Sequence, residues 1–149
     1  MAAGSYRMNY SAAELIKIVT DSFEAERTND VQLGESLITD DFKQRSMIIS
    51  GDKIFPVFAG GDIPVGLDEA YALEGREFHV WNVAANESTQ TVFIELTEVE
   101  PTKDSKRVWP YVLVCQIQDG KIKRSRHYGD PATLKSDISV EQVRDAVLD

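Results

Sequence analysis

The sequence predicts an α+β fold in which helices pack over one face of a curved antiparallel sheet. Three observations lead to this prediction. Helical patterns gather near the two ends of the chain, long apolar-rich β-type runs fill most of the second half, and an Asp-Gly pair joins the last two of these runs. Because helices and strands are segregated along the chain, consecutive strands are expected to pair antiparallel.

The N-terminal helix is predicted by its cap and its apolar stripe. Ser11 and Glu14 have the spacing of a capping box, in which the two residues satisfy backbone N–H groups at the start of a helix. Apolar side chains then recur at helical spacing until about Arg27. Asn29-Asp30 begins a second, shorter helix. The residues of the apolar stripe are Leu15, Ile16, Val19 and Phe23.

The middle of the chain alternates between β segments and breaks. Phe42–Ile49 is expected to be a strand, and the proline-interrupted segment Ile54–Phe58 is either an edge strand or a loop. Leu67–Leu73 has the length of a short helix. Glu77–Ala84 and Thr89–Glu100 then form a hairpin whose register the sequence leaves open.

The stretch from Val108 to Pro131 contains the clearest turn signal of the chain. Asp119-Gly120 favours a type I′ turn, because both of its residues tolerate positive φ. An uninterrupted ladder from this turn places Val112 opposite His127. One face is then expected to hold Val112, Val114, Gln116, Lys123, Ser125 and His127, and the other Trp109, Tyr111, Leu113, Cys115, Ile122, Arg124, Arg126 and Tyr128. The alternation alone leaves open which face looks inward.

Composition indicates one domain over residues 1–149, with a core from about 11 to 134 and a terminal helix over about 139–148 that Ser139 and Gln142 cap. The net charge of −9 argues against nucleic acid as a partner, because binding there depends on Lys and Arg. No apolar run approaches the roughly 20 residues of a membrane span. With a single cysteine and no continuous apolar segment near the N-terminus, a cytoplasmic protein is expected.

The order of elements and the stretch GKIKRSRHYGDPATL resemble the nuclear transport factor 2-like superfamily, over about Ser11 to Leu134. The stretch resembles a strand of limonene epoxide hydrolases and phenazine-biosynthesis A/B proteins. SnoaL-like polyketide cyclases and ketosteroid isomerases belong to the same group. The resemblance implies a cone-shaped, strongly bent sheet wrapped around the N-terminal helices, a cystatin-like roll with a pocket inside. It also implies a homodimer that forms through the outer face of the sheet.

The resemblance also implies site residues. His127 stands where the hydrolases and phenazine proteins have an inward catalytic carboxylate, and Ser125 stands where the hydrolases have a pocket aromatic. The Arg and Asp that the hydrolases carry on the preceding long strand correspond to Leu96 and Glu98. Since that Arg is missing, epoxide hydrolysis is the less expected activity. The Tyr and two Asp of ketosteroid isomerases do not appear at matching positions.

Two residues are the candidates for acid–base chemistry. His127, with an ordinary pKa near 6.5, is suited to moving a proton at neutral pH. Glu98 ends an apolar strand face, and burial there would raise its pKa towards that of a general acid or base. Gln44 and Ser46 stand where the hydrolases have polar residues that bind water and substrate, so the resemblance implies that they orient a substrate oxygen. The alternative for all four is that they are solvent-exposed strand residues.

The remaining expectations concern ligands and partners. Leu96, Val112, Val114 and Ser125 are expected to contact the substrate, a small apolar or cyclic molecule. No metal is expected, because the histidines and the cysteine lack ligand spacing. No cofactor is expected either, and Gly60-Gly61 lacks the lysine and the helix start of a phosphate-binding loop. The aromatic residues of the second hairpin face are expected to be covered by a second subunit, or else by the curled sheet and the terminal helix.

Two functions remain open on this basis. The first is a cofactor-independent enzyme of the isomerase, dehydratase or polyketide-cyclase type, in which His127 and Glu98 are catalytic. The second is a non-catalytic dimeric module of the same fold that binds a ligand or a protein. A deep apolar cavity with His127 and Glu98 within hydrogen-bond reach of a shared point would favour the enzyme. A collapsed or solvent-filled cone with an exposed aromatic patch outside would favour the module.

Overall fold

The computed structural model describes residues 9–47, 49–50, 53–54, 74–129 and 138–149, without the side chains of residues 46, 49–50 and 53–54. The short helix expected at Leu67–Leu73 lies outside the described residues, as does most of the segment Ile54–Phe58. The helices are α1 (Ala12–Thr28), α2 (Val31–Ser36) and α4 (Val140–Leu148). The strands are β1 (Ile38–Ser46), β2 (Ile49–Ser50), β3 (Lys53–Ile54), β4 (Glu77–Asn86), β5 (Thr91–Pro101), β6 (Lys106–Gln118) and β7 (Lys121–Tyr128).

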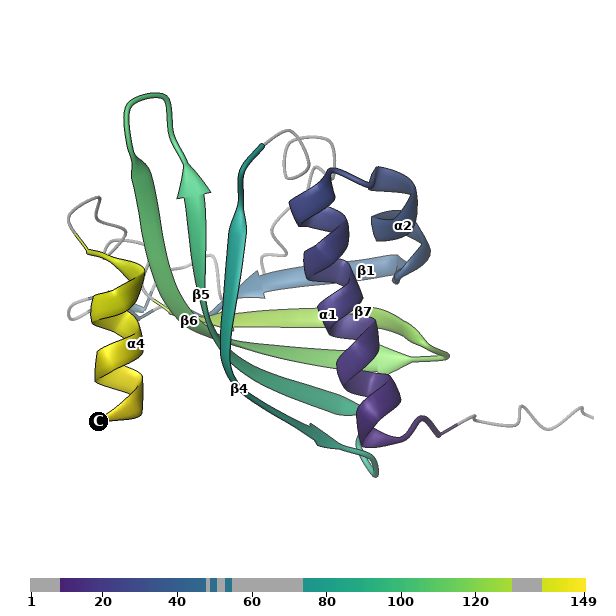
Figure 1. The fold of residues 1–149 in the computed structure, drawn as a ribbon. Helices are drawn as coiled ribbons and strands as arrows, with labels where there is room; N and C mark the ends of the chain where they lie inside the picture. Colours follow the sequence, from purple (N-terminus) through teal and green to yellow (C-terminus); the bar gives the residue numbers. More distant parts are fainter. Residues whose placement is uncertain (1–8, 48, 51–52, 55–73, 130–137) are drawn as a thin grey trace, which may run out of the picture.

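Five strands form one curved sheet in the order β1-β7-β6-β5-β4 (Figure 1). β2 pairs with β3 in a separate sheet. The strands from β4 to β7 pair antiparallel, as expected. β1 pairs parallel with β7, which corrects the expectation of a wholly antiparallel sheet. Parallel pairing is possible because β1 and β7 are far apart in the chain, so the connection is long enough to cross over.

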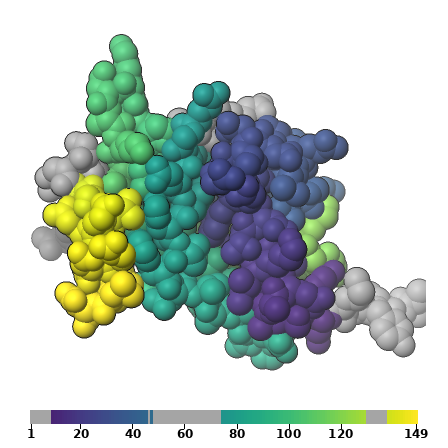
Figure 2. All heavy atoms as spheres, in the orientation of Figure 1, coloured from purple at the N-terminus to yellow at the C-terminus, as the bar shows by residue number. Residues whose placement is uncertain are grey.

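The helices lie on different sides of this sheet. α1 packs across the inner, concave face, where it contacts β4 and β5, while α4 contacts β5. Figure 2 shows α4 and α1 on either side of β4. Within the described residues, no helix combines the length and the apolar character needed to cross a membrane.

Both predicted capping boxes are confirmed. The Ser11 side chain accepts a hydrogen bond from the backbone N–H of Glu14, and the Glu14 carboxylate accepts one from the backbone N–H of Ser11 at 2.8 Å. Ser139 and Gln142 make the same reciprocal pair at the start of α4. Asn29 ends α1 in the left-handed conformation, with φ of 57°. The polar residues that cap the helices therefore fix their ends where the sequence places them.

The hydrophobic core lies between α1 and the inner face of the sheet. The stripe of α1 buries Leu15, Val19 and Phe23, and each fully buried side chain of this size contributes about 1.5–3 kcal/mol. Phe23 stacks on Phe78 of β4 with 4.9 Å between the ring centroids. The sheet contributes Val92, Ile94, Leu96, Tyr111, Leu113, Cys115, Ile117 and Ile122.

The register of the last hairpin differs from the expected one. The turn at Asp119-Gly120 is confirmed, with φ of 52° and 76°, and Ile117 pairs with Ile122. A β-bulge follows, in which Lys123 has no partner on β6, so that Leu113 instead of Val112 lies opposite His127. One extra residue moves every later side chain of β7 to the other face of the sheet.

The bulge reverses the expected surroundings of His127. Tyr111, Leu113 and Cys115 lie on the same inner face as His127, facing α1. Val112 and Val114 lie on the outer face, so the prediction that they share a face with His127 is wrong. The prediction that Trp109, Tyr111 and Leu113 form an outer surface with Tyr128 is wrong for the same reason. The outer face instead exposes Phe93, Val112 and Tyr128, at 43%, 37% and 43%.

Candidate active site

A polar cluster interrupts the apolar inner face at one end of the sheet. Its centre is Glu98 of β5, which is only 2% exposed. Oε1 of Glu98 accepts a hydrogen bond of 2.9 Å from Nε of Arg76 and another from Nη2 of the same guanidinium. The hydroxyl of Tyr111 donates to Oε2 at 3.0 Å. Burial raises the pKa of Glu98, and the positive charge of Arg76 opposes this rise.

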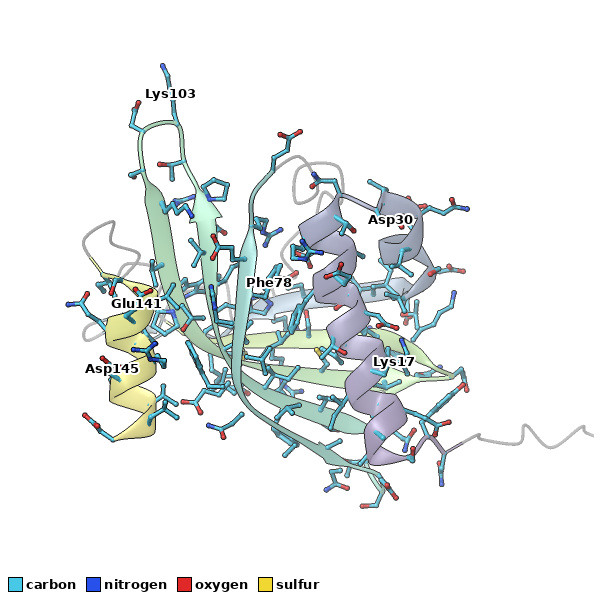
Figure 3. The ribbon with its side chains drawn as sticks, in the orientation of Figure 1. Lys17, Asp30, Phe78, Lys103, Glu141 and Asp145 are labelled. Carbon is cyan, nitrogen blue, oxygen red and sulfur yellow. The ribbon has the colours of Figure 1, made fainter. Side chains whose placement is uncertain are left out.

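Arg76 joins Glu98 to a second carboxylate, on α1. Nη1 of Arg76 lies 2.7 Å from Oε2 of Glu26, and the guanidinium lies over the ring of Phe78 at 5.2 Å. Phe78 itself is labelled in Figure 3, beside α1. Burial raises the pKa of Glu26 to about 7, with Arg76 acting against the rise and the charge of Glu98 adding to it. A carboxyl group with this pKa can bind and release a proton near neutral pH.

His127 of β7 is a neutral member of this cluster. Its Nε2 lies 3.0 Å from Nε2 of Gln44. Because an amide nitrogen can only donate, the ring nitrogen accepts, and the proton of the neutral imidazole is on Nδ1. Burial, together with the smaller effect of the positive charge of Arg76, lowers the pKa of His127 to about 4. The expectation of an ordinary pKa near 6.5 is therefore wrong, and the ring is a neutral hydrogen-bond donor at physiological pH.

Aromatic rings connect His127 with Glu98. The ring of Tyr111 stacks on that of His127, with 5.0 Å between centroids and 9° between planes, while its hydroxyl binds Glu98. Trp109 lies 4.4 Å from Tyr111 and 5.8 Å from His127 between ring centroids, and it is the β6 residue paired with Glu98. Nε1 of Trp109 is buried and has no hydrogen-bond partner within the part of the chain that the structure describes.

The structure brings together three of the predicted site residues: Glu98, His127 and Gln44. Leu96 and Ser125 are buried on the same inner face, two residues from Glu98 and His127 respectively. Ser46 pairs with His127 between β1 and β7, and its side chain lies outside the described part. Val112 and Val114, on the outer face, do not contribute to the cluster.

Four members of the cluster were not predicted: Arg76, Glu26, Tyr111 and Trp109. Glu26 follows Phe23 by three residues and therefore continues the buried stripe of α1, which is a signal in the sequence. Tyr111 and Trp109 were assigned to the wrong face because the bulge at Lys123 is not visible in the pattern. Arg76 precedes β4, and no motif marks it. Among the residues that the structure describes, no group of His, Cys, Asp and Glu is arranged to hold a metal ion.

Comparisons with solved structures place this architecture among known folds. No family model and no curated protein sequence matches the chain. It is similar to an LEH-like epoxide hydrolase of M. tuberculosis, with 18% identity and a TM-score of 0.65 over 83% of this chain and 87% of that one. It is also similar to a Δ5-3-ketosteroid isomerase of Mycobacterium sp., with 13% identity and a TM-score of 0.63 over 82% and 97%.

A third similarity is to a putative SnoaL-like polyketide cyclase of Jannaschia sp. CCS1, with 13% identity and a TM-score of 0.57 over 93% of this chain and 99% of that one. An NTF2-like protein of Cytophaga hutchinsonii matches with 12% identity and a TM-score of 0.57 over 80% and 93%. The chain has the nuclear transport factor 2-like fold, which confirms the predicted α+β roll. At these identities the comparisons establish the fold, which enzymes of several activities share.

Proposed function

We propose that the protein is a cofactor-independent enzyme that moves protons on a small, neutral, apolar or cyclic substrate. The observation that supports this most is the buried carboxyl group of Glu98, which has a raised pKa and is held by Tyr111 and Arg76. Perturbed carboxyl groups in an apolar interior are typical of general acids and bases. The similar isomerase and cyclase give this fold two reactions of the appropriate class.

In this proposal the two sides of the cluster have different roles. Glu98 takes a proton from a carbon next to a carbonyl group and returns it elsewhere on the substrate. Nδ1–H of His127 donates a hydrogen bond to the carbonyl oxygen, where negative charge develops. Gln44 holds His127 in the tautomer that has this donor. A neutral imidazole with a low pKa remains a donor throughout the physiological range.

The charge of the cluster indicates the class of substrate. Two acidic groups, Glu26 and Glu98, contact one basic group, Arg76, and His127 is neutral. An anionic substrate would gain no net attraction in this setting. The apolar residues beside the cluster, Leu96 and Trp109, favour a hydrocarbon ring over a polar chain. We therefore expect a neutral ketone or enone.

A second candidate reaction is the hydrolysis of an epoxide. The hydrolases resembled by the sequence place an Arg beside their catalytic Asp, and Leu96 occupies that position here. Arg76 supplies a guanidinium to Glu98 from a different element. This contact favours the activation of a water molecule by Glu98. The similarity to the epoxide hydrolase supports the same reaction.

The experiment measures the exchange of substrate hydrogens with the solvent. The protein is incubated in D₂O with a panel of cyclic ketones and enones, and deuterium incorporation beside the carbonyl is measured by NMR. A parallel panel of cyclic epoxides is assayed for diols. We expect Glu98→Gln to reduce the rate by about 10²–10⁴-fold. Glu95→Gln changes a carboxylate on the opposite face of the same strand and should keep the wild-type rate.

The outcome separates the enzyme from the alternative. A Glu98→Gln variant that folds and exchanges at the wild-type rate contradicts the proposed role. If no compound in either panel reacts with the wild type, while one binds and shifts NMR signals of Trp109, the non-catalytic binding module is favoured. Tyr111→Phe removes one hydrogen bond to Glu98 without a change of charge, and it serves as a second test if Glu98→Gln does not fold.

A further inference from the structure

Two carboxyl groups from different parts of the fold share one guanidinium. Glu26 is on α1, Glu98 is on β5, and Arg76 between them contacts both through different nitrogens. The side chains of Arg76 and Glu98 are 9% and 3% exposed, and that of Glu26 is 26% exposed. The three residues therefore form one unit at the boundary between the helix and the sheet.

This unit has one more acidic group than basic groups. When both carboxyl groups are ionised, the net charge is −1 in a region with little access to water, which is unfavourable. Binding one proton removes the excess charge. Because Arg76 interacts with both carboxylates, the ionisation of one changes the proton affinity of the other.

We propose that Glu26 is a positioning residue that sets the protonation state of Glu98 through Arg76, so that the two carboxyl groups hold one proton between them. When Glu26 is protonated, it no longer competes with an ionised Glu98 for the guanidinium. When Glu26 is ionised, the attraction is divided and Glu98 binds a proton more readily. The site thereby keeps one proton available at neutral pH.

Among the residues that the structure describes, the other groups that face this unit do not supply the missing charge. On β6, the Tyr111 hydroxyl donates to Glu98, and burial raises its pKa well above the ordinary value, so it stays neutral. On β7, His127 is neutral, because its pKa is lowered to about 4. Glu100 on β5 adds negative charge and is paired with Arg107. The pKa of about 7 for Glu26 agrees with one retained proton.

This inference rests on the proposed function only where it calls Glu98 the acid–base group. The shared proton itself is measurable without any substrate. The protein is labelled with ¹³C at the glutamate side-chain carboxyl carbon, and the chemical shifts are followed in a pH titration. Signals of Glu26 and Glu98 are assigned from the two single Gln variants. In the wild type, we expect two coupled steps, the upper one near neutral pH.

The decisive variant is Glu26→Gln. Without the carboxylate of Glu26 competing for Arg76, the proton affinity of Glu98 should fall at least about tenfold, a shift of about one pH unit, and the neutral step should disappear. Glu26→Asp keeps the charge and should keep two coupled steps. Glu24→Gln, on the exposed side of the same helix, is the matched control and should leave the titration unchanged.

An unchanged titration of Glu98 in Glu26→Gln overturns the proposal, as does a wild type in which both carboxyl groups titrate below about pH 5. If Glu26→Gln fails to fold, Glu26→Asp decides the question, because uncoupled steps in that variant have the same meaning. Proton sharing together with full turnover by Glu98→Gln would leave this inference standing and remove the proposed function. If Glu98→Gln loses turnover but the two carboxyl groups share no proton, the proposed function stands and this inference is overturned.

Discussion

The hydroxyl of Tyr111 donates a hydrogen bond of 3.0 Å to Oε2 of Glu98, deep between α1 and the sheet. The same tyrosine ring stacks on His127. One side chain of β6 thus links a carboxyl group on β5 with an imidazole on β7. The two candidate acid–base residues are on strands that are not neighbours in the sheet, and Tyr111 on the intervening strand fixes their relative position.

Removing this hydroxyl should destabilise the protein. Tyr111→Phe leaves the ring stack intact and takes one donor away from a buried, charged acceptor, an interaction that contributes about 1.5–3 kcal/mol. Urea unfolding should show that the free energy of unfolding falls by about this amount. Tyr128→Phe, whose residue is 43% exposed on the outer face, is the matched control and should change stability by less than about 0.5 kcal/mol. Equal losses in the two variants would show that the hydrogen bond to Glu98 is weak.

The partly buried His127 should make stability depend on pH. The pKa of His127 is about 4 in the folded chain, below the ordinary 6.5, so between these values the unfolded chain binds the proton and the folded chain does not. The contribution of neutral His127 to the free energy of unfolding is present above about pH 6.5 and is lost as the pH falls towards 4. Between about pH 7 and pH 5 this amounts to about 2 kcal/mol.

Urea unfolding at both pH values measures this difference. His127→Gln should lose less stability than the wild type when the pH is lowered. His79→Gln controls for the removal of a histidine, since His79 is the other one and lies on the outer face beside Trp81. If His127→Gln and the wild type have the same pH dependence, the ring is not buried in its neutral form.

The bulge in β7 should be essential to the fold. Deleting Lys123 would remove the unpaired residue, and an uninterrupted ladder would turn His127 and Ser125 to the outer face. We expect the deletion to lower the free energy of unfolding by more than about 4 kcal/mol, which is at the upper end of the effects of single-site changes. Lys123→Ala keeps the residue count and should fold normally. A deletion variant with wild-type stability would mean that the bulge can move along the strand.

We propose that the outer face of the sheet binds a second copy of the chain, because the residues of this face suit a dimer interface. Phe93, Val112 and Tyr128 expose apolar surface in its centre. Arg124 and Arg126 lie towards the β1 edge and Glu95 towards the β4 edge. Two copies related by a two-fold axis can therefore place the basic edge of one against the acidic edge of the other.

The oligomeric state tests this surface. Sedimentation velocity should show a dimer for the wild type and a monomer for Phe93→Lys, because a charge at the centre of the face opposes association. Leu148→Lys changes an apolar residue that is 74% exposed on α4, and it should remain dimeric. A wild-type monomer at about 100 µM, well above the dissociation constant of a stable dimer, would contradict the proposed interface.

Local signals were enough to predict most of the architecture. The capping boxes at Ser11 and Ser139 and the turn at Asp119-Gly120 depend on residues within four positions of each other, and all three are confirmed. The parallel pairing of β1 with β7 was missed because it joins segments about 80 residues apart, without a local pattern.

The candidate site was predicted only in part, for a related reason. Glu98, His127 and Gln44 follow from the resemblance, and in the structure Tyr111 links Glu98 to His127, which contacts Gln44. Their chemistry was not predictable, because the low pKa of His127 depends on burial and on Arg76, which is distant in sequence. Arg76 and Glu26 meet only when α1 is docked on the sheet, so no spacing in the chain could identify them.

Cys115 sits in the same core, 2% exposed, and burial raises the pKa of its thiol to about 12. At neutral pH the sulfur is therefore protonated and shielded, and alkylating reagents will not modify it while α1 covers the sheet. Its labelling rate under native conditions then measures how often the interior opens. Cys115 therefore serves as a natural probe of opening, and the opening rate can be measured without an engineered cysteine.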